Sequence, residues 1–376
     1  MRNIVFPLIL IGIFAIMGLA VWYLARRTAF IFGTRANWWY VAYSITLVSS
    51  LVFMFLASQP WTLNPIGHFC SIASSVMVGI LLYLLMVMIL VDWVQWFAHL
   101  PHWLFGTVVG TLTLIVCGYA TYNASNTKLV EVKVQLPKLQ QNIRIVQLTD
   151  THIGHFRGKE HVQKLVSLVN KANPDIIFFT GDCFESWYNF NAQTLEPLAQ
   201  LQAPIYFVEG NHDGYVNSKQ AKQLLREAGV HVLENEVATD KGLCIVGLEY
   251  MSADTKSVNA HAPHRSETIE SILPSLPIDK TLPVIALQHS PIGTNYIEKA
   301  GIDLLLSGHT HGGQLWPLTW INNRAFRYNK GLSKQNTLQI YTSCGSGSFG
   351  PPMRLGTPSE IAVLDLETAP EKNNHN

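Results

Sequence analysis

The chain has 376 residues, a formal net charge of +1 at pH 7 and 14% charged residues, against about 25% in an average soluble protein. The deficit lies almost wholly before residue 122, so composition predicts an apolar amino-terminal half and a globular carboxyl-terminal half long enough for its own core. No basic stripe stands out, and no nucleic-acid partner is expected.

The five cysteines predict neither a disulfide framework nor a thiolate metal site. Cys70 and Cys117 fall within apolar runs, and Cys183, Cys244 and Cys344 are an odd number without C-x-x-C spacing. Buried thiols are therefore expected.

Four apolar runs predict a transmembrane region at residues 1–121. Each run approaches the roughly 20 residues that a helix needs to cross a hydrocarbon core. The first has the charged start of a signal peptide, but it lacks a clear small-residue cleavage site and three more spans follow, which favours a retained anchor. The expected spans are 4–25, 38–57, 69–91 and 104–120.

Basic residues predict the orientation of this region in a cell membrane. Arg26, Arg27 and Arg35 lie between the first two spans, whereas the other two predicted loops carry no Lys or Arg. The positive-inside tendency places the first loop in the cytoplasm and the carboxyl-terminal half outside it. Arg2 and Lys128 oppose this assignment.

One acidic residue, Asp92, lies at the end of the third span. Charges inside a membrane commonly mark functional sites. The interfacial position of Asp92 nevertheless favours a solvated carboxylate.

From Val130 onward, short apolar runs alternate with helical segments, which predicts a layered α/β domain with substantial parallel sheet. Residues 122–141 are assigned to a linker and first strand, 142–366 to the α/β domain, and 367–376 to a disordered tail. The expected helices are Gly158–Ala172 and Lys219–Ala228. The expected strands are Ile143–Leu148, Asp175–Thr180, Ile205–Val208, Cys244–Leu248, Val284–Leu287, Asp303–Leu306, Gln339–Thr342 and Ile361–Leu364.

Five polar motifs follow five of these strands. They contain three carboxylates, one amide and five imidazoles, and glycines at 181, 210, 308 and 312 allow tight turns or close backbone approach. Because ligands bind at the carboxyl ends of strands in layered α/β folds, the motifs are expected to converge. They are Asp150-Thr151-His152, Gly181-Asp182, Gly210-Asn211-His212-Asp213, His289 and Gly308-His309-Thr310-His311-Gly312.

These residue types suit a site for two metal ions. Two cations about 3.5–4 Å apart can activate a nucleophile and clamp the oxygens of a phosphate ester. Imidazole and carboxylate together favour Mn, Fe, Zn or Co over Mg or Ca.

The motifs resemble those of the calcineurin-like metallophosphoesterase superfamily, whose pattern is D-x-H, G-D, G-N-H-[DE], a lone H and G-H-x-H. The resemblance covers residues 142–366, and the multi-span first half together with the wording Gly-His-Thr-His-Gly-Gly-Gln resembles the membrane-anchored bacterial branch. It implies an α/β fold: a four-layer αββα metallophosphoesterase sandwich, preceded by an all-α transmembrane region of about four helices.

The resemblance also implies roles for individual residues. His212 would be catalytic, giving a hydrogen bond or proton to the phosphoryl or leaving oxygen during in-line attack by a metal-bound hydroxide. The metal positions fall in three groups: one divalent ion (Mn, Fe, Zn or Co) would take Asp150, His152 and His311, the other Asn211, His289 and His309, and Asp182 would bridge both.

Three further residues have open roles. Glu185 stands where many relatives carry an Asp that orients the catalytic histidine, so it either does this with a longer arm or is a surface residue. Asp213 binds substrate or caps a turn, and Arg354 contacts a phosphate or makes a structural salt link. The sequence Gly345–Gly350 matches G-x-G-x-x-G, but Pro351 and Pro352 exclude the helix that a dinucleotide site requires. A flexible connection near the site is expected instead.

The chain is thus interpreted as a membrane-anchored phosphoesterase acting on a phosphate ester or pyrophosphate. Four spans make a lipid-linked substrate one hypothesis, and membrane lipids are the expected surroundings. The alternatives are a catalytically inactive metal-binding scaffold, a phosphodiesterase acting on soluble nucleotides, and a transport path regulated by the outer domain. Scarce intramembrane charge disfavours transport. The sequence does not identify the oligomeric state.

The predicted orientation can be tested with a reporter fused after Asn376. A reporter that is active only in the cytoplasm should stay inactive, and one that is active only outside it should be active. The opposite pair of results would overturn the positive-inside assignment.

Overall fold

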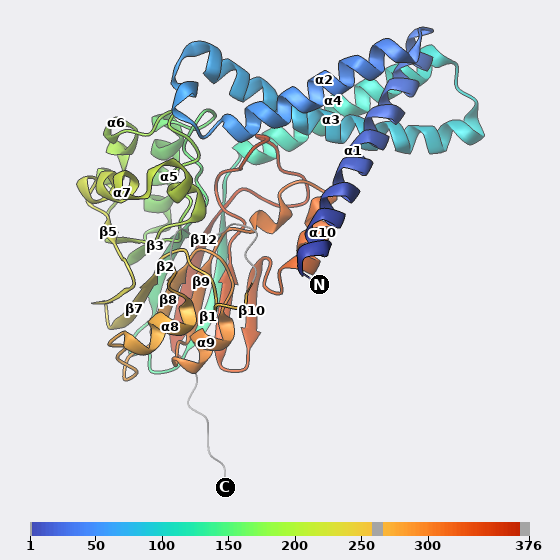
Figure 1. The fold of residues 1–376 in the computed structure, drawn as a ribbon. Coiled ribbons are helices and arrows are strands. Elements are labelled where there is room, and N and C mark those ends of the chain that lie inside the picture. Colours follow the sequence, from blue (N-terminus) through green and yellow to red (C-terminus); the bar gives the residue numbers. More distant parts are fainter. Residues whose placement is uncertain (1, 258–265, 369–376) are drawn as a thin grey trace. The chain divides into compact units, whose positions relative to one another are not determined.

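The computed structural model describes residues 2–257 and 266–368, with side chains described from residue 11. Two compact units make up the chain (Figure 1). A helical unit comprises Met1–Ala57, Phe69–Tyr122 and Gly350–Pro352, and a sandwich unit comprises Ser58–His68, Asn123–Phe349 and Met353–Asn376.

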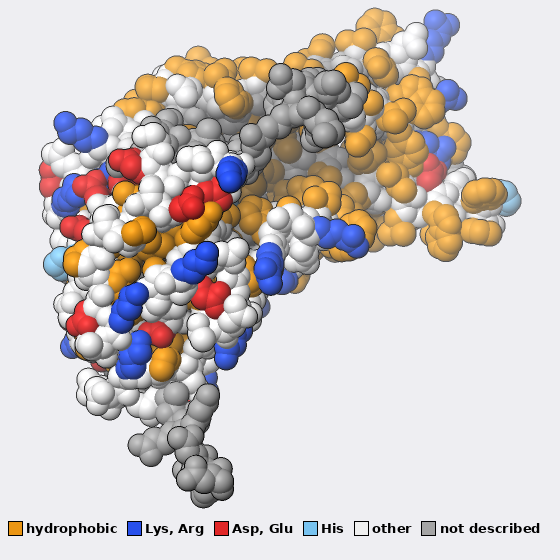
Figure 2. All heavy atoms as spheres, turned by 60° about the horizontal axis from the view of Figure 1, so that its bottom comes forward, with side chains coloured by type: hydrophobic (Ala, Val, Ile, Leu, Met, Phe, Trp, Pro, Cys, Tyr) orange, Lys and Arg blue, Asp and Glu red, His pale blue; other side chains and the backbone are white. Residues whose placement is uncertain are grey.

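Among the residues that the structure describes, four helices are long and apolar enough to cross a membrane, the number that the sequence predicts. Hydrophobic side chains cover the surface of the helical unit in Figure 2, as expected where lipid replaces water as the surrounding solvent. The candidate spans are Ile11–Phe32 of α1, Ala36–Leu56 (α2), Pro65–Ala98 (α3) and His102–Ser125 (α4); α1 itself is Arg2–Phe32. A short helix, η1 (Pro60–Leu63), precedes α3.

The prediction of a solvated carboxylate at Asp92 is wrong. Helix α1 continues through Arg27 instead of ending before it, and the guanidinium of Arg27 forms an ion pair with Asp92 of α3. The hydroxyl of Tyr23 donates to the same carboxylate at 2.5 Å. Both charged side chains are three-quarters covered, and an opposite charge offsets much of the cost of that burial.

The sandwich unit holds two six-stranded sheets, ordered β1-β12-β2-β3-β4-β5 and β10-β11-β9-β8-β7-β6. The neighbours from β2 to β5 are parallel, as are β7, β8, β9 and β11. The first sheet consists of β1 (Lys128–Leu136), β2 (Ile143–Leu148), β3 (Ile176–Phe179), β4 (Ile205–Phe207), β5 (His231–Val232) and β12 (Glu360–Thr368). The second consists of β6 (Glu236–Asp240), β7 (Leu243–Leu248), β8 (Val284–Gln288), β9 (Leu304–Ser307), β10 (Gly331–Gln335) and β11 (Leu338–Thr342).

Three hydrophobic clusters define four layers. One lies between the first sheet and helices α5, α6 and α7, which lie together in Figure 1. A second lies between the sheets, and a third lies between the second sheet and helices α8 and α9. This is the predicted αββα sandwich. The helices are α5 (Lys159–Ala172), α6 (Ala192–Leu195), α7 (Asn211–Glu227), α8 (Ile269–Ile272), α9 (Thr294–Lys299) and α10 (Leu318–Ala325), with short helices η2 (Glu196–Gln200), η3 (Leu273–Ser275) and η4 (His311–Gly313).

The structure has strands at all eight predicted positions and adds strands that lack an apolar signal. The additional β6 and β10 are edge strands with several exposed or half-buried side chains, so no continuous apolar run marks them. Strand β12 extends to Thr368, beyond the predicted strand end at Leu364 and into the first two residues of the predicted tail 367–376. The predicted tail from 369 onward lies outside the described residues.

All five cysteines are free thiols in the described structure, and all but Cys70 are buried.

Candidate metal centre

Backbone hydrogen bonds join the loops that carry the five motifs. The amide of Asp150 donates to the carbonyl of Gly181 at 3.0 Å, and that of His152 donates to Asp182 at 3.1 Å. In the second sheet, the amide of Gly308 donates to the carbonyl of His289 at 2.8 Å. Gln147, at the end of β2, crosses between the sheets and donates to the carbonyl of Ser307 at 2.9 Å. The motifs therefore meet at one edge of the sandwich.

Five of the predicted site residues have left-handed backbone. Non-glycine residues adopt positive φ rarely, and such conformations concentrate where the surrounding structure imposes them, often at functional sites. The residues are Asp150 (φ 51°), His152 (47°), Asp182 (52°), His309 (69°) and His311 (49°).

Two glycines allow the loops to approach these residues. A Cβ on Gly210 would lie 2.2 Å from Oδ1 of Asp182, and one on Gly308 would lie 2.1 Å from Oγ1 of Thr149 and 2.2 Å from Oδ2 of Asp150. Any larger residue would displace a carboxylate of the site.

The first group of candidate ligands contains Asp150, His152 and His311, all buried. Nε2 of His311 lies 3.2 Å from Oδ1 of Asp150 and 3.0 Å from Nε2 of His152. The other Asp150 oxygen accepts a hydrogen bond from the Thr149 hydroxyl at 2.7 Å. Three ligand atoms therefore face one point, and the Thr149 hydroxyl holds the Asp150 carboxylate through its other oxygen.

The second group contains Asp182, His289 and His309. Nε2 of His289 lies 3.1 Å from Oδ2 of Asp182 and 3.2 Å from Nδ1 of His309. Nδ1 of His289 lies 2.7 Å from the carbonyl of Thr180, so it carries the proton and leaves Nε2 free as a ligand. Predicted ligand Asn211 is 4% exposed, and its Oδ1 accepts no hydrogen bond within the described structure.

This donor set fits two divalent cations. Oδ2 of Asp182 lies 3.1 Å from a nitrogen of the second group and 3.9 Å from Nε2 of His152 in the first, which is the position a shared ligand would take. A buried carbonyl oxygen without a donor, such as Oδ1 of Asn211, gains from a cation because an unsatisfied buried polar atom is costly.

Buried charges around Asp182 compensate each other. Burial alone would raise the pKa of Asp182, but the imidazoles, His289 foremost, outweigh it and hold that pKa below its usual value. Burial lowers the pKa of His289, yet the charge of Asp182 outweighs burial and raises it to about 9. The buried carboxylates thus draw positive charge into the centre, from protons or from cations.

Glu185 faces two imidazoles. Its Oε2 lies 2.5 Å from Nδ1 of His152 and 2.9 Å from Nδ1 of His212. Burial lowers the pKa of His212, but the charges of Glu185 and Asp182 together raise it. The longer side chain of glutamate therefore reaches the position from which a carboxylate orients the histidine.

Asp213 is fully buried. Its carboxylate accepts the backbone amides of Gly210 and Phe184, each at 3.0 Å. It caps the first turn of α7 and connects that turn to the chain after Asp182. Capping is one of its two predicted roles, and contact with substrate stays a prediction.

Arg354 is fully buried, and its guanidinium forms no ion pair within the described residues, whereas its predicted contact with a phosphate stays a prediction. It donates to the carbonyls of Cys344 at 2.6 Å and Gly347 at 2.6 Å, and to Nδ1 of His311 at 2.9 Å. The Gly345–Gly350 connection between β11 and β12 is therefore held in place near the site. The flexible connection was predicted because Pro351 and Pro352 exclude a helix, and that argument does not reveal a buried arginine that binds the loop.

Other residues around the centre lie outside the five motifs. Arg157 is buried and donates to the Ser348 carbonyl and hydroxyl. The ring of Phe349, 46% exposed, lies 5.2 Å from that of His311, and the ring of Tyr250 lies 6.0 Å from that of His289. Sequence gave no signal for these contacts, because aromatic and arginine side chains are common in any domain.

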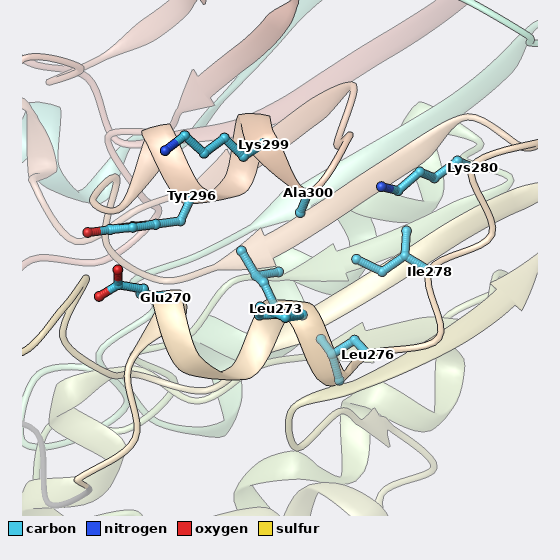
Figure 3. Close-up of a pocket in the computed structure, with 9 residues that line it drawn as sticks. Glu270, Leu273, Leu276, Ile278, Lys280, Tyr296, Lys299 and Ala300 are labelled. Carbon is cyan, nitrogen blue, oxygen red and sulfur yellow. The ribbon is translucent and has the colours of Figure 1, made fainter.

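A pocket of about 340 Å³ lies elsewhere, between α8 and α9 (Figure 3). Glu270, Leu273, Tyr296 and Lys299 are among its lining residues, and none of the predicted site residues lines it. The pocket has no part in the candidate metal centre.

Comparison with known proteins agrees with this geometry. The sequence profile of the calcineurin-like phosphoesterase family matches residues 143–313. An uncharacterized metallophosphoesterase of Aquifex aeolicus is 32% identical over 62% of this chain and 88% of its own length. Phosphodiesterase YaeI of Escherichia coli is 30% identical over 59% of this chain and 82% of its own.

A transmembrane protein with metallophosphoesterase domain from Danio rerio is 32% identical over 69% of this chain. The matched region spans 62% of that protein, less than two thirds of its length.

Substituting Gly308 with Ala should weaken metal retention and stability together. Overpacking costs about 1–3 kcal/mol, and the new methyl would push on the Asp150 carboxylate. Bound metal per chain and the thermal unfolding midpoint, both measured in detergent, should fall. Gly118→Ala in α4, where a Cβ meets nothing within 4 Å, is the control. Normal metal content in Gly308→Ala would show that the loop tolerates a Cβ and contradict the close approach.

Proposed function

Because the chain belongs to the calcineurin-like phosphoesterase family, we propose that it is a membrane-anchored phosphoesterase that uses two divalent metal ions. The supporting observation is the position of Asp182, which belongs to one group of three ligand atoms and whose Oδ2 also lies 3.9 Å from Nε2 of His152 in the other group. When bound, such ions supply a nucleophile from water at neutral pH and neutralise phosphate charge.

The residues proposed to hold the ions are the seven predicted from the motifs. Asp150, His152 and His311 form one set and Asn211, His289 and His309 the other, with Asp182 shared. Manganese, iron, zinc and cobalt all suit this mixture of imidazole, carboxylate and amide oxygen.

His212 is proposed as the residue that donates a hydrogen bond or proton to the phosphoryl or leaving oxygen. Its amide is fixed by Oδ1 of Asp182 at 2.8 Å, and its ring by Glu185. Glu185 holds Nδ1, so Nε2 is the ring nitrogen left to meet substrate. The raised pKa of His212 favours the protonated form that an acid requires.

The substrate is proposed to be a phosphate ester or pyrophosphate, with a lipid-linked compound as the specific hypothesis. The four candidate spans support a location in a membrane, where lipid phosphates are available. The aromatic ring of Phe349 beside His311 would suit an apolar substituent. We propose the cell membrane as the location, with the sandwich unit outside the cytoplasm.

The full-length protein in detergent should hydrolyse a simple phosphodiester such as bis(p-nitrophenyl) phosphate when Mn²⁺ is supplied, and should lose activity on chelation. His212→Ala should lower kcat about 100- to 10,000-fold, the range for a lost acid or base, while bound metal stays at two ions per chain. Asp182→Asn should lose both activity and metal.

Inactivity of the unsubstituted protein with both metals bound, across a panel of small esters and detergent-solubilised lipid phosphates, would favour the metal-binding scaffold instead. Hydrolysis of small esters and nucleotides without hydrolysis of lipid phosphates would leave the phosphoesterase intact and remove the lipid-linked substrate.

Glu185→Gln should lower kcat about 10- to 100-fold, the usual cost of losing a partner that orients a ligand or catalytic group. The amide retains the shape but not the charge that holds both imidazoles. Steady-state kinetics with metal analysis measures the effect. Glu196→Gln, at a side chain 59% exposed on η2, is the control. Equal kinetics in the two variants would assign Glu185 no orienting role.

A further inference from the structure

Helix α10, labelled in Figure 1, and the turn before it expose four large apolar side chains. In a globular domain, a cluster of such residues on one short segment marks an interaction surface. They are Trp316 (50% exposed), Leu318 (44%), Trp320 (62%) and Ile321 (57%), and are called the α10 patch below.

The α10 patch is fixed to the candidate metal centre. Asn322 of α10 donates to the carbonyl of Thr310, which stands between His309 and His311, at 2.9 Å. A Cβ on Gly313 would lie 2.5 Å from Cα of Thr319, so the helix packs directly on the end of the fifth motif. The patch and the ligands of that motif therefore form one connected structure.

Basic side chains follow the patch along the chain. Arg324, Arg327 and Lys330 are exposed, and the guanidinium of Arg324 lies 4.9 Å from the ring of Trp320. No Asp or Glu occurs anywhere between Asp303 and Glu360. Tryptophan together with Arg and Lys is the composition of segments that lie in the interface of an anionic membrane.

A candidate membrane span also lies close to the sandwich unit along the chain. Helix α4, a candidate span, ends at Ser125, and β1 of the sandwich begins at Lys128. Two residues between them leave no long linker. A second copy of the chain is a poorer occupant, because a symmetric contact through the patch would bring the same basic residues together without an acidic partner.

We propose that the α10 patch is a membrane-docking surface that rests among anionic lipid headgroups. Trp316, Leu318, Trp320 and Ile321 enter the interface, and Arg324, Arg327 and Lys330 meet lipid phosphates. Since α10 packs on the His309–His311 motif, docking sets the distance of the metal centre from the headgroups. The surface requires the membrane spans but does not depend on the proposed catalytic activity.

Depth-dependent quenching in the full-length protein tests this surface. The chain is reconstituted in nanodiscs containing phosphatidylglycerol, with an environment-sensitive fluorophore on Ile321→Cys and lipids that carry a quencher near the headgroup. Ile321 is chosen because its replacement retains both tryptophans. We expect at least twofold quenching and blue-shifted emission. The control is Leu332→Cys on β10, an apolar position 42% exposed, which should show neither, and labelled unsubstituted protein corrects for native cysteines.

A second variant separates docking from other causes. Arg324→Glu and Arg327→Glu, combined in the Ile321→Cys background, should reduce the quenching at least twofold. Equal quenching at positions 321 and 332, or none at either, would overturn the proposal. Blue-shifted emission at 321 without lipid quenching would mean that protein covers the patch and would also overturn it. Because no outcome uses catalysis, failure here leaves the phosphoesterase proposal to its own test.

Discussion

The close approach of loops around the Asp182 carboxylate is the constraint on which the candidate centre depends. Oδ1 accepts the amide of His212, Oδ2 faces the ring of His289, and Gly210 passes so near that a Cβ would clash. Such an approach needs glycine where loops touch and left-handed backbone at Asp182 itself. The parallel strands of both sheets supply that geometry by ending at one edge.

A buried cluster of carboxylates and imidazoles is stable only when its charges are matched. With protons alone, the imidazoles of His152 and His289 take positive charge, as their raised pKa values indicate. Divalent cations would replace those protons, and Oδ1 of Asn211 would gain a partner that it lacks within the described residues. Binding that occurs only in the folded state stabilises that state, so ligand geometry and domain stability are linked.

Local sequence patterns predict most of the fold but few of the side-chain contacts. Strands β2, β3 and β8 follow from continuous apolar runs, and the αββα arrangement from the motifs that succeed them. The ion pair of Arg27 with Asp92 and the buried guanidinium of Arg354 were predicted otherwise. In both cases tertiary packing brings together residues from separate elements or loops. The identity of one residue in the sequence does not show which residue will be its partner. Strands β6 and β10 lie at the edges of the second sheet, where their side chains are less buried. No continuous apolar run marks them for that reason.

The loop Gly345–Gly350 lies beside the candidate metal centre and carries Phe349 next to His311. Its carbonyls are gathered by Arg354, which also donates to Nδ1 of His311, and Arg157 fixes Ser348 from the other side. Phe349, whose ring is 46% exposed and lies 5.2 Å from that of His311, is held at its backbone by Gln314, which accepts its amide at 3.2 Å and donates to its carbonyl at 3.0 Å. Arg354 therefore holds the shape of the loop through its carbonyls, and a direct contact with phosphate stays a prediction. Because the same guanidinium also contacts His311, a proposed metal ligand, the shape of the loop and the position of that ligand depend on one buried side chain.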